Sequence, residues 1–335
     1  MSAQGVQHPP AVGAGEVVSL SIVATLYRSE PYVVEFCDRA AAAARAIGKD
    51  FEIILVNDGS PDGALRVAKE YADVHPEVTV VDLSRNFGHH QAMMAGLSHS
   101  HGSLVFLIDS DLEEEPEWLI DFSKKLSESG ADVVYGVQAA RRGGLFERVS
   151  GYLYYVVVQA LTGLPIPSNL VTARLMTRRY VDALTRFEER EIDIAGLWAL
   201  TGFLQVPHTI KKHSTSATTY TLALKVRLLI DSVSSFSSAP LIGIFYFGVL
   251  VSALAGLFLC YLILNRYFLD TPLSGWTSVM ASVWLLGGLQ ISFIGVIGIY
   301  LAKVFTEAKR RPNTIVREIY AQPQTRAKSE SANAE

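Results

Sequence analysis

The sequence predicts an α/β fold with a mostly parallel sheet, followed by a hairpin of two membrane-spanning helices. Three observations lead to this prediction. Between residues 17 and 138, short β-rich apolar runs alternate with helical patterns, which is typical of parallel strands joined by crossover helices. Polar clusters follow the first four of these strands. Two long uncharged apolar segments lie closer to the carboxyl terminus, and their lengths suit helices that cross a bilayer.

The composition excludes several classes of protein. Of the 335 residues, 50% are hydrophobic and 19% are charged, and a mean hydropathy of +0.26 is too high for a disordered or fibrous chain. A net charge of -4 provides no basic field for a nucleic acid, so we expect no nucleic-acid partner. Cys37 and Cys260 lie in unlike surroundings, so we expect neither a disulfide nor a zinc site. Residues 1–16 lack the pattern of a signal peptide and are expected to form a disordered tail.

The strands are expected at residues 17–24, 51–56, 78–83, 103–108 and 131–136. Ligands of parallel sheets bind at the carboxyl ends of the strands, where the loops converge. The polar residues in these loops are therefore the candidate binding residues. They are Thr25, Tyr27 and Glu30 after the first strand, Asp58 after the second, Arg85 after the third, and Asp109, Ser110 and Asp111 after the fourth.

Asp109 and Asp111 are the strongest chemical signal. Two carboxylates separated by one small residue at a strand end can face one hard cation, and oxygen ligands suit Mg²⁺ or Mn²⁺ bound with a diphosphate. A solvated turn or a helix cap is the alternative for such a short motif. Glu113 is the one candidate third ligand, because the following glutamates are expected to form the negatively charged first turn of a helix.

Asp58 and His89 each have two interpretations. Asp58 is placed to accept a hydrogen bond from a uracil or guanine base, or to hold a turn with Gly59, and both roles are compatible. Gly88 permits a close turn into the next helix. We expect His89 and His90 to be exposed residues at the start of that helix rather than ligands.

The apolar segments 241–264 and 277–302 are each long enough to cross a hydrocarbon layer of about 30 Å. Buried core helices are the alternative. The flanks are richer in Lys and Arg than the connection 265–276, so the positive-inside rule predicts both termini in the cytoplasm. Residues 145–164 and 220–236 have the pattern of interfacial amphipathic helices, or of ordinary helices on a soluble core. We therefore expect five parts: an N-terminal tail (1–16), a cytoplasmic α/β domain (17–219), an amphipathic helix beside the membrane (220–238), the two membrane-spanning helices (239–302) and a cytoplasmic C-terminal tail (303–335).

Several ordered motifs together resemble the family 2 glycosyltransferases of the polyprenyl-phosphate type. They are Thr25-x-Tyr27, Val56-Asn-Asp58-Gly-Ser60, Leu83-Ser-Arg-Asn-Phe-Gly88, Ala95-Gly-Leu97 and Asp109-Ser-Asp111, followed by the two apolar segments. The resemblance covers roughly residues 18–310. It implies a GT-A nucleotide-sugar fold, a nucleotide-sugar donor with UDP favoured over GDP, and inverting transfer to undecaprenyl phosphate. A bacterial inner-membrane location for cell-envelope glycan synthesis follows from it.

The resemblance also assigns residues. Asp109, Asp111 and Glu113 would hold the cation, and Arg174, His213 and Tyr220 would close over the diphosphate or sugar. Members of the family that act on bactoprenol have an Asp-Phe-Arg-Leu stretch, which appears here as Thr172-Ala-Arg174-Leu175 without the carboxylate. Arg141, Arg142 and Arg148 are candidates for gripping the lipid phosphate, with contact to anionic headgroups as the alternative. Small residues on the apolar segments leave packing surface for a homo-oligomer.

A phosphate acceptor needs no general base, because it is already an oxyanion, whereas an alcohol acceptor does. Two alternatives remain open. The chain could transfer a sugar to a hydroxyl of a lipid-linked glycan, with a base from the acidic cluster formed by Glu188, Glu189, Glu191 and Asp193. It could also be a membrane scaffold that keeps the fold without catalysis.

Overall fold

The computed structural model describes residues 18–138, 156–163, 167, 169–190, 193–211, 230, 233–269 and 275–322. Strands and helices alternate through the first part of the chain. Their order is β1 (Leu20–Leu26), α1 (Val33–Ala46), β2 (Phe51–Asn57), α2 (Ala64–Ala72), β3 (Val78–Leu83), α3 (His89–Ser98), β4 (Leu104–Leu107), α4 (Trp118–Ser129) and β5 (Val133–Gln138). The five strands predicted from the sequence are therefore present, with ends displaced by a few residues.

The second part of the chain adds strands that the sequence analysis did not predict. The elements are β6 (Leu170–Thr177), α6 (Arg178–Leu184), α7 (Ile194–Leu200), β7 (Gln205–Ile210), α9 (Ala239–Leu269), α10 (Trp276–Ala308) and β8 (Val316–Tyr320). Residues 303–335 were expected to be a cytoplasmic tail, yet β8 pairs with β3. The segment after the long helices therefore contributes to the same sheet as the start of the chain.

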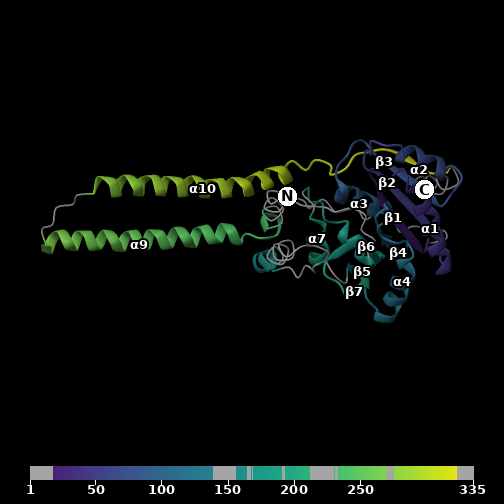
Figure 1. Cartoon of the computed structure of the whole chain (residues 1–335), viewed down its shortest axis with the longest axis horizontal. Coiled ribbons are helices and arrows are strands. Elements are labelled where there is room, and N and C mark those ends of the chain that lie inside the picture. Colours follow the sequence, from purple (N-terminus) through teal and green to yellow (C-terminus); the bar gives the residue numbers. More distant parts are fainter. Residues whose placement is uncertain are drawn as a thin grey trace, which may run out of the picture. The chain divides into compact units, whose positions relative to one another are not determined.

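Within the described residues, eight strands form one sheet with the order β7-β5-β6-β4-β1-β2-β3-β8 (Figure 1). β1 pairs in parallel with both β2 and β4, and β2 pairs in parallel with β3. β6 and β8 run antiparallel to their neighbours. The α/β fold with a mostly parallel sheet is confirmed. Because β1 to β4 are parallel, the loops that follow them leave the sheet at one edge.

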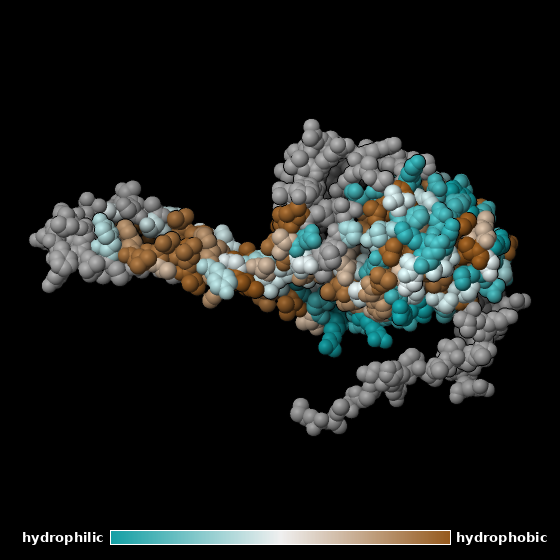
Figure 2. Space-filling model, turned by 90° about the horizontal axis from the view of Figure 1, so that it is seen from below, coloured by the Kyte–Doolittle hydropathy of each residue, from teal (hydrophilic) through white to brown (hydrophobic). Residues whose placement is uncertain are grey.

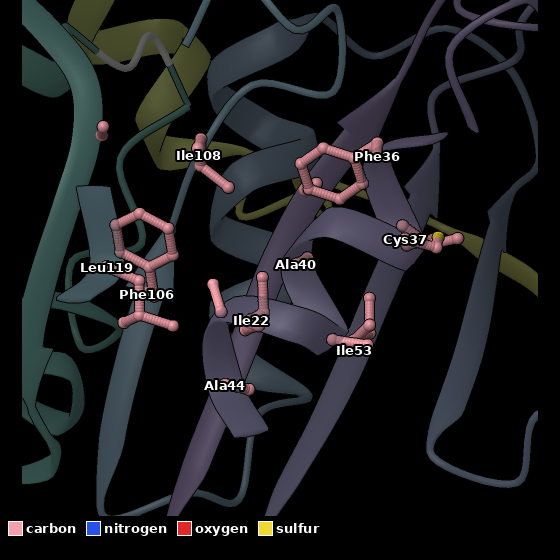
Figure 3. Close-up of a cluster of buried hydrophobic side chains, with 14 of the residues drawn as sticks. Ile22, Phe36, Cys37, Ala40, Ala44, Ile53, Phe106, Ile108 and Leu119 are labelled. Atoms are coloured by element: carbon pink, nitrogen blue, oxygen red, sulfur yellow. The ribbon is translucent and has the colours of Figure 1, made fainter. Parts of the chain in front are cut away.

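Helices cover both faces of the sheet. On one face, Phe36, Ala40 and Ala44 of α1 pack over Ile22 of β1 and Ile53 of β2 (Figure 3). The small alanines let the helix lie close to the strands, and burial of these side chains removes apolar surface from water. The apolar runs of β1 and β2 are buried on both sides, which explains why they lack a strict polar and apolar alternation.

Helix α3 covers the opposite face through Gly96. A Cβ atom at this position would lie 2.4 Å from Cγ1 of Val23 and 2.9 Å from Cγ2 of Val56. Glycine is therefore required by the close approach of the helix to β1 and β2. This contact matters for the site because α3 begins at the loop that follows β3.

α9 and α10 form an antiparallel hairpin (Figure 1), and the rings of Phe247 and Phe293 meet edge to face at 5.9 Å. The described surface of this hairpin is largely hydrophobic (Figure 2). Among the described residues, one segment, Ser282–Ala308, is long and apolar enough to cross a membrane, with a mean hydropathy of 1.9. The described apolar part of α9, Ala239–Ala255, is shorter. A second membrane span remains a prediction.

The described chain also divides differently from the boundaries expected from the sequence. It forms two compact units, of which one contains the sheet together with β8, and the other contains the hairpin together with residues 156–163. The sheet unit is thus not one continuous segment. The two predicted interfacial helices, 145–164 and 220–236, lie mostly outside the described residues, although 156–162 and 233–236 are helical.

Replacement of Gly96 by leucine should destabilise the sheet unit by about 1–3 kcal/mol, because the added side chain would overpack the contact with Val23 and Val56. Unfolding followed by circular dichroism measures this change. Gly130 is the matched control: it follows α4 with φ +62°, and no atom lies within 4 Å of an added Cβ. Gly130→Asn should alter stability by less than about 1 kcal/mol. Equal losses in the two variants would contradict the packing role of Gly96.

Candidate active site

The loops after β1, β2, β3 and β4 surround one cavity of about 450 Å³ at the carboxyl edge of the sheet. Its lining residues are Thr25, Tyr27, Ser29, Asp58, Asn86, Gly88, His89, Asp109, Ser110 and Asp111. Six of the residues proposed from the sequence are among them, with at least one from each of three loops. The structure thus brings together side chains that are far apart in the sequence.

Asp58 holds two of these loops together. Its Oδ1 accepts a hydrogen bond from the backbone N–H of Phe87 at 2.7 Å, and its Oδ2 accepts from Gly88 at 3.1 Å. Burial raises the pKa of the Asp58 carboxyl, and these two amides oppose the increase. Asp58 therefore holds the turn, and each of its carboxylate oxygens retains a further lone pair that can accept a hydrogen bond.

The turn at Asp58 also requires glycine at the next position. Gly59 has φ +60°, and a Cβ atom there would lie 2.5 Å from the backbone nitrogen of Asn86. A larger residue would push the loop after β2 away from the loop after β3. Gly59 thus allows the backbone approach that the hydrogen bonds of Asp58 then stabilise.

Asp109 lies among partners from two distant elements. Thr172 of β6 donates from Oγ1 to Asp109 Oδ2 at 2.9 Å, and Nε2 of His89 lies 3.2 Å from Oδ1. Nδ1 of His89 lies 3.0 Å from Oγ1 of Thr25. Desolvation lowers the pKa of His89, but the hydrogen bond and charge of Asp109 outweigh it, so the pKa of the imidazole is raised.

His89 is an exposed residue at the start of α3, as the sequence predicts, and it also makes a contact that the sequence does not predict. It is the first residue of α3, as expected, and its side chain is about half exposed. However, the ring borders the cavity and contacts Asp109 rather than facing solvent alone. A histidine at a helix start carries no signal of such a role, because its partner comes from another strand.

Asp109 and Asp111 both border the cavity, and they form the oxygen-rich donor set that suits Mg²⁺ or Mn²⁺. Ions of this kind are commonly held by one or two carboxylates, with phosphates and water as the other ligands. Glu113 is not gathered with the pair. Its backbone N–H donates to Oδ1 of Asp111 at 3.0 Å, and the described residues contain no group of three or more His, Cys, Asp or Glu side chains arranged around one metal position.

Two buried charged residues near the site were not predicted from the sequence. Glu114 is fully buried, and its Oε1 accepts from the backbone N–H of Thr172 at 3.0 Å. The sequence predicts that Glu114 belongs to the negatively charged first turn of a helix, but α4 begins four residues later. Arg174 is also buried, with its guanidinium over the ring of Trp198. Burial lowers the pKa of Arg174 to about 9.

Some residues proposed from the sequence lie outside the cavity lining. Glu30 accepts from the backbone N–H of Gly63 at 2.9 Å and pairs with Arg66, so it holds the start of α2. Arg85 is exposed and stacks over Phe87 at 4.0 Å. Arg174 is buried in β6, away from a position where it could close over a sugar. Arg141, Arg142, Arg148, His213 and Tyr220 lie outside the described residues.

Residues 21–185 match the model of the family described as Glycosyl transferase family 2. The chain is 51% identical over 301 residues to a protein of Mycobacterium tuberculosis (strain CDC 1551 / Oshkosh) named as a glycosyltransferase, covering 90% of this chain and 88% of the relative. The protein therefore belongs to glycosyl transferase family 2 and is an enzyme. This membership confirms the resemblance that the loop motifs show.

Two further relatives carry more specific names. The undecaprenyl-phosphate 4-deoxy-4-formamido-L-arabinose transferase of Klebsiella pneumoniae subsp. pneumoniae is 27% identical, with 94% of this chain and 97% of the relative covered. The bactoprenol glucosyl transferase of Shigella phage SfV is 27% identical, with 90% of this chain and 98% of the relative covered. Both similarities extend over almost the full length of the chains.

Thr172 offers a direct test of the site. Thr172→Val keeps the shape of the side chain but removes the donor to Asp109, and a hydrogen bond of this kind contributes about 1 kcal/mol. We therefore expect the concentration of Mn²⁺ that gives half-maximal activity to rise about fivefold. Thr172→Ser retains the hydroxyl and should behave like the wild type. Identical metal dependence in the two variants would contradict a role for this hydrogen bond.

Proposed function

We propose that the protein transfers a sugar from a nucleotide sugar to the phosphate of a polyprenyl phosphate, with undecaprenyl phosphate as the bacterial acceptor. A UDP-sugar is the favoured donor. The observation that carries this proposal is the cavity that joins Asp109 and Asp111 to the paired loops of Asp58 and Gly88. A cation site and a nucleotide site then lie side by side.

The carboxylates that line the cavity suit the binding of a nucleotide sugar with a divalent cation. Asp58 would accept a hydrogen bond from a base N–H, and Asp109 and Asp111 would hold Mg²⁺ or Mn²⁺. When bound, the cation supplies positive charge against the diphosphate of the donor. Thr172 and His89 keep the Asp109 carboxylate in one orientation, so that it does not have to reorganise when the donor binds.

The reaction is a displacement at the anomeric carbon. An oxygen of the lipid phosphate attacks this carbon and forms the new bond, and the bond to the nucleoside diphosphate breaks, with the electron pair leaving on the diphosphate. The configuration is inverted because the two oxygens lie on opposite sides of the carbon. No proton has to be removed from the acceptor, which is an anion at neutral pH. Thr172, which stands where the members that act on bactoprenol have Asp, is consistent with this chemistry.

A lipid acceptor is supported by the apolar hairpin and by the names of the two relatives that act with undecaprenyl phosphate or bactoprenol. We further propose that the protein lies in the bacterial inner membrane, crosses it twice, and has both termini in the cytoplasm. The pairing of β8 with β3 supports this arrangement. Chain segments before and after the hairpin share one sheet, so they must lie on the same side of a membrane.

Transfer to a hydroxyl of a lipid-linked glycan has less support. Glu188, Glu189 and Asp193 are not among the residues that line the cavity. Asp193 caps α7 by accepting from the backbone N–H of Gly196, and Glu191 lies outside the described residues. The acidic cluster is therefore a poor source of a general base in this region.

The full chain in lipid nanodiscs should transfer label from a nucleotide sugar to undecaprenyl phosphate, and the labelled lipid should be sensitive to mild acid. The assay compares UDP-sugars with GDP-sugars in the presence of Mn²⁺ or Mg²⁺. Undecaprenol, which lacks the phosphate, is the control and should receive no label. Transfer to undecaprenol, or only to a glycan hydroxyl, would contradict the proposed acceptor.

Asp111→Ala should lower turnover by about 100-fold or more, because charge that develops on the leaving diphosphate would lose its compensation. Membrane insertion and thermal unfolding should change little, since Asp111 is exposed at the end of the sheet. Glu128→Ala, on the exposed side of α4, is the control with unchanged turnover. An active Asp111→Ala protein would refute the metal assignment, and an inactive wild type would favour a scaffold.

A further inference from the structure

The strand β8 contacts both β3 and the loop that follows β3. It pairs antiparallel with β3, with Asp82 opposite Glu318 and Leu83 opposite Val316. The backbone N–H of Ser84 then donates to the carbonyl of Ile315 at 2.8 Å. The pairing therefore continues into the first residue of the loop that supplies Asn86, Gly88 and His89 to the cavity.

Arg317 of β8 connects this loop to a buried carboxylate. Its Nη1 donates to Oδ2 of Asp82 at 3.2 Å, and its Nη2 donates to the carbonyl of Ser84 at 2.6 Å. Asp82 is 1% exposed, and a buried carboxylate is unfavourable unless it receives hydrogen bonds. One guanidinium thus donates both to the carboxylate of Asp82 in β3 and to the backbone carbonyl of Ser84 in the following loop.

The same carboxylate is linked to the neighbouring loop. Oδ1 of Asp82 accepts from Nδ2 of Asn57 at 2.7 Å, and Oδ1 of Asn57 accepts from the backbone N–H of Ser60 at 3.2 Å. Asn57 directly precedes Asp58. A continuous chain of hydrogen bonds therefore runs from Arg317 through Asp82 and Asn57 to the turn that holds Asp58 against the loop after β3.

The other end of β8 is attached independently of this network. Nζ of Lys69 lies 3.8 Å from the ring centroid of Tyr320, and Nε2 of Gln322 donates to the carbonyl of Asp73 at 2.5 Å. These contacts join the last residue of β8 to α2, and the segment directly after β8 to the residue that follows α2. They provide variants that weaken the docking of β8 without removing a contact to the cavity loops.

We propose that Arg317 is a positioning residue of the nucleotide site, which it shapes by holding the loops 57–60 and 84–88 at a fixed separation through Asp82 and Ser84. The inference rests on the proposed function, because it assigns the cavity to a nucleotide. It makes β8 part of the donor site, even though β8 follows the apolar hairpin in the chain.

The test measures nucleotide binding and steady-state kinetics on the full chain in nanodiscs. In Arg317→Ala, the Kd for UDP with Mn²⁺ and the KM for the nucleotide sugar should each rise about tenfold, while kcat stays within about twofold of the wild type. Arg317→Lys should recover part of the affinity. An ammonium retains the charge, but it does not have the two fixed N–H groups that reach Asp82 and Ser84 together. This variant also carries the test if Arg317→Ala does not fold.

Gln322→Ala is the matched control. It removes an anchor of β8, so it should lower the unfolding temperature without changing the Kd or the KM. Wild-type affinity in both Arg317 variants would overturn the inference, as would equal weakening in Gln322→Ala, which would indicate that any loosening of β8 has this effect. Absence of binding of both UDP and GDP to the wild type would instead refute the proposed function.

Discussion

Buried carboxylates at one edge of the sheet impose the constraint on which the site depends. Asp58, Asp82 and Glu114 are almost fully buried, and the side chain of Asp109 is 19% exposed. A carboxylate in such a position is stable only if donors surround it. In each case the donors come from elements that are distant in the sequence, so satisfying these charges also fixes the arrangement of the loops.

This requirement explains why the cavity is built from several layers. The loop after β3 satisfies Asp58, β6 satisfies Asp109 and Glu114 through Thr172, and β8 satisfies Asp82 through Arg317. The antiparallel strands β6 and β8 thus do more than extend the sheet. They deliver further hydrogen-bond donors to Asp109, Glu114 and Asp82. The region that would bind the nucleotide sugar and the cation is consequently held in place by β6 and by β8.

Much of the fold was predictable because its signals are local. The apolar runs of β1 to β5 alternate with helical patterns, and the polar residues Thr25, Asp58, Asp109 and Asp111 follow strand ends. Parallel connectivity then required those ends to converge. Roles that depend on a distant partner were not predictable. Glu114 has the local pattern of a helix start, and its burial becomes apparent only once β6 brings Thr172 to it. The same reason applies to His89, whose contact with Asp109 joins α3 to β4.

The class of fold, the edge of the sheet at which the site lies, the aspartate pair and the apolar hairpin can be read from the order of the residues, because each depends on periodicity or on position along a strand. Which polar residues reach the cavity depends on the folded arrangement of the elements. This arrangement places Glu30 and Arg174 in supporting positions, brings His89 and Thr172 to Asp109, and returns the chain after the hairpin to the sheet as β8. The physical reason is that hydrogen-bond partners of buried charges are selected by proximity in space, which no local pattern encodes.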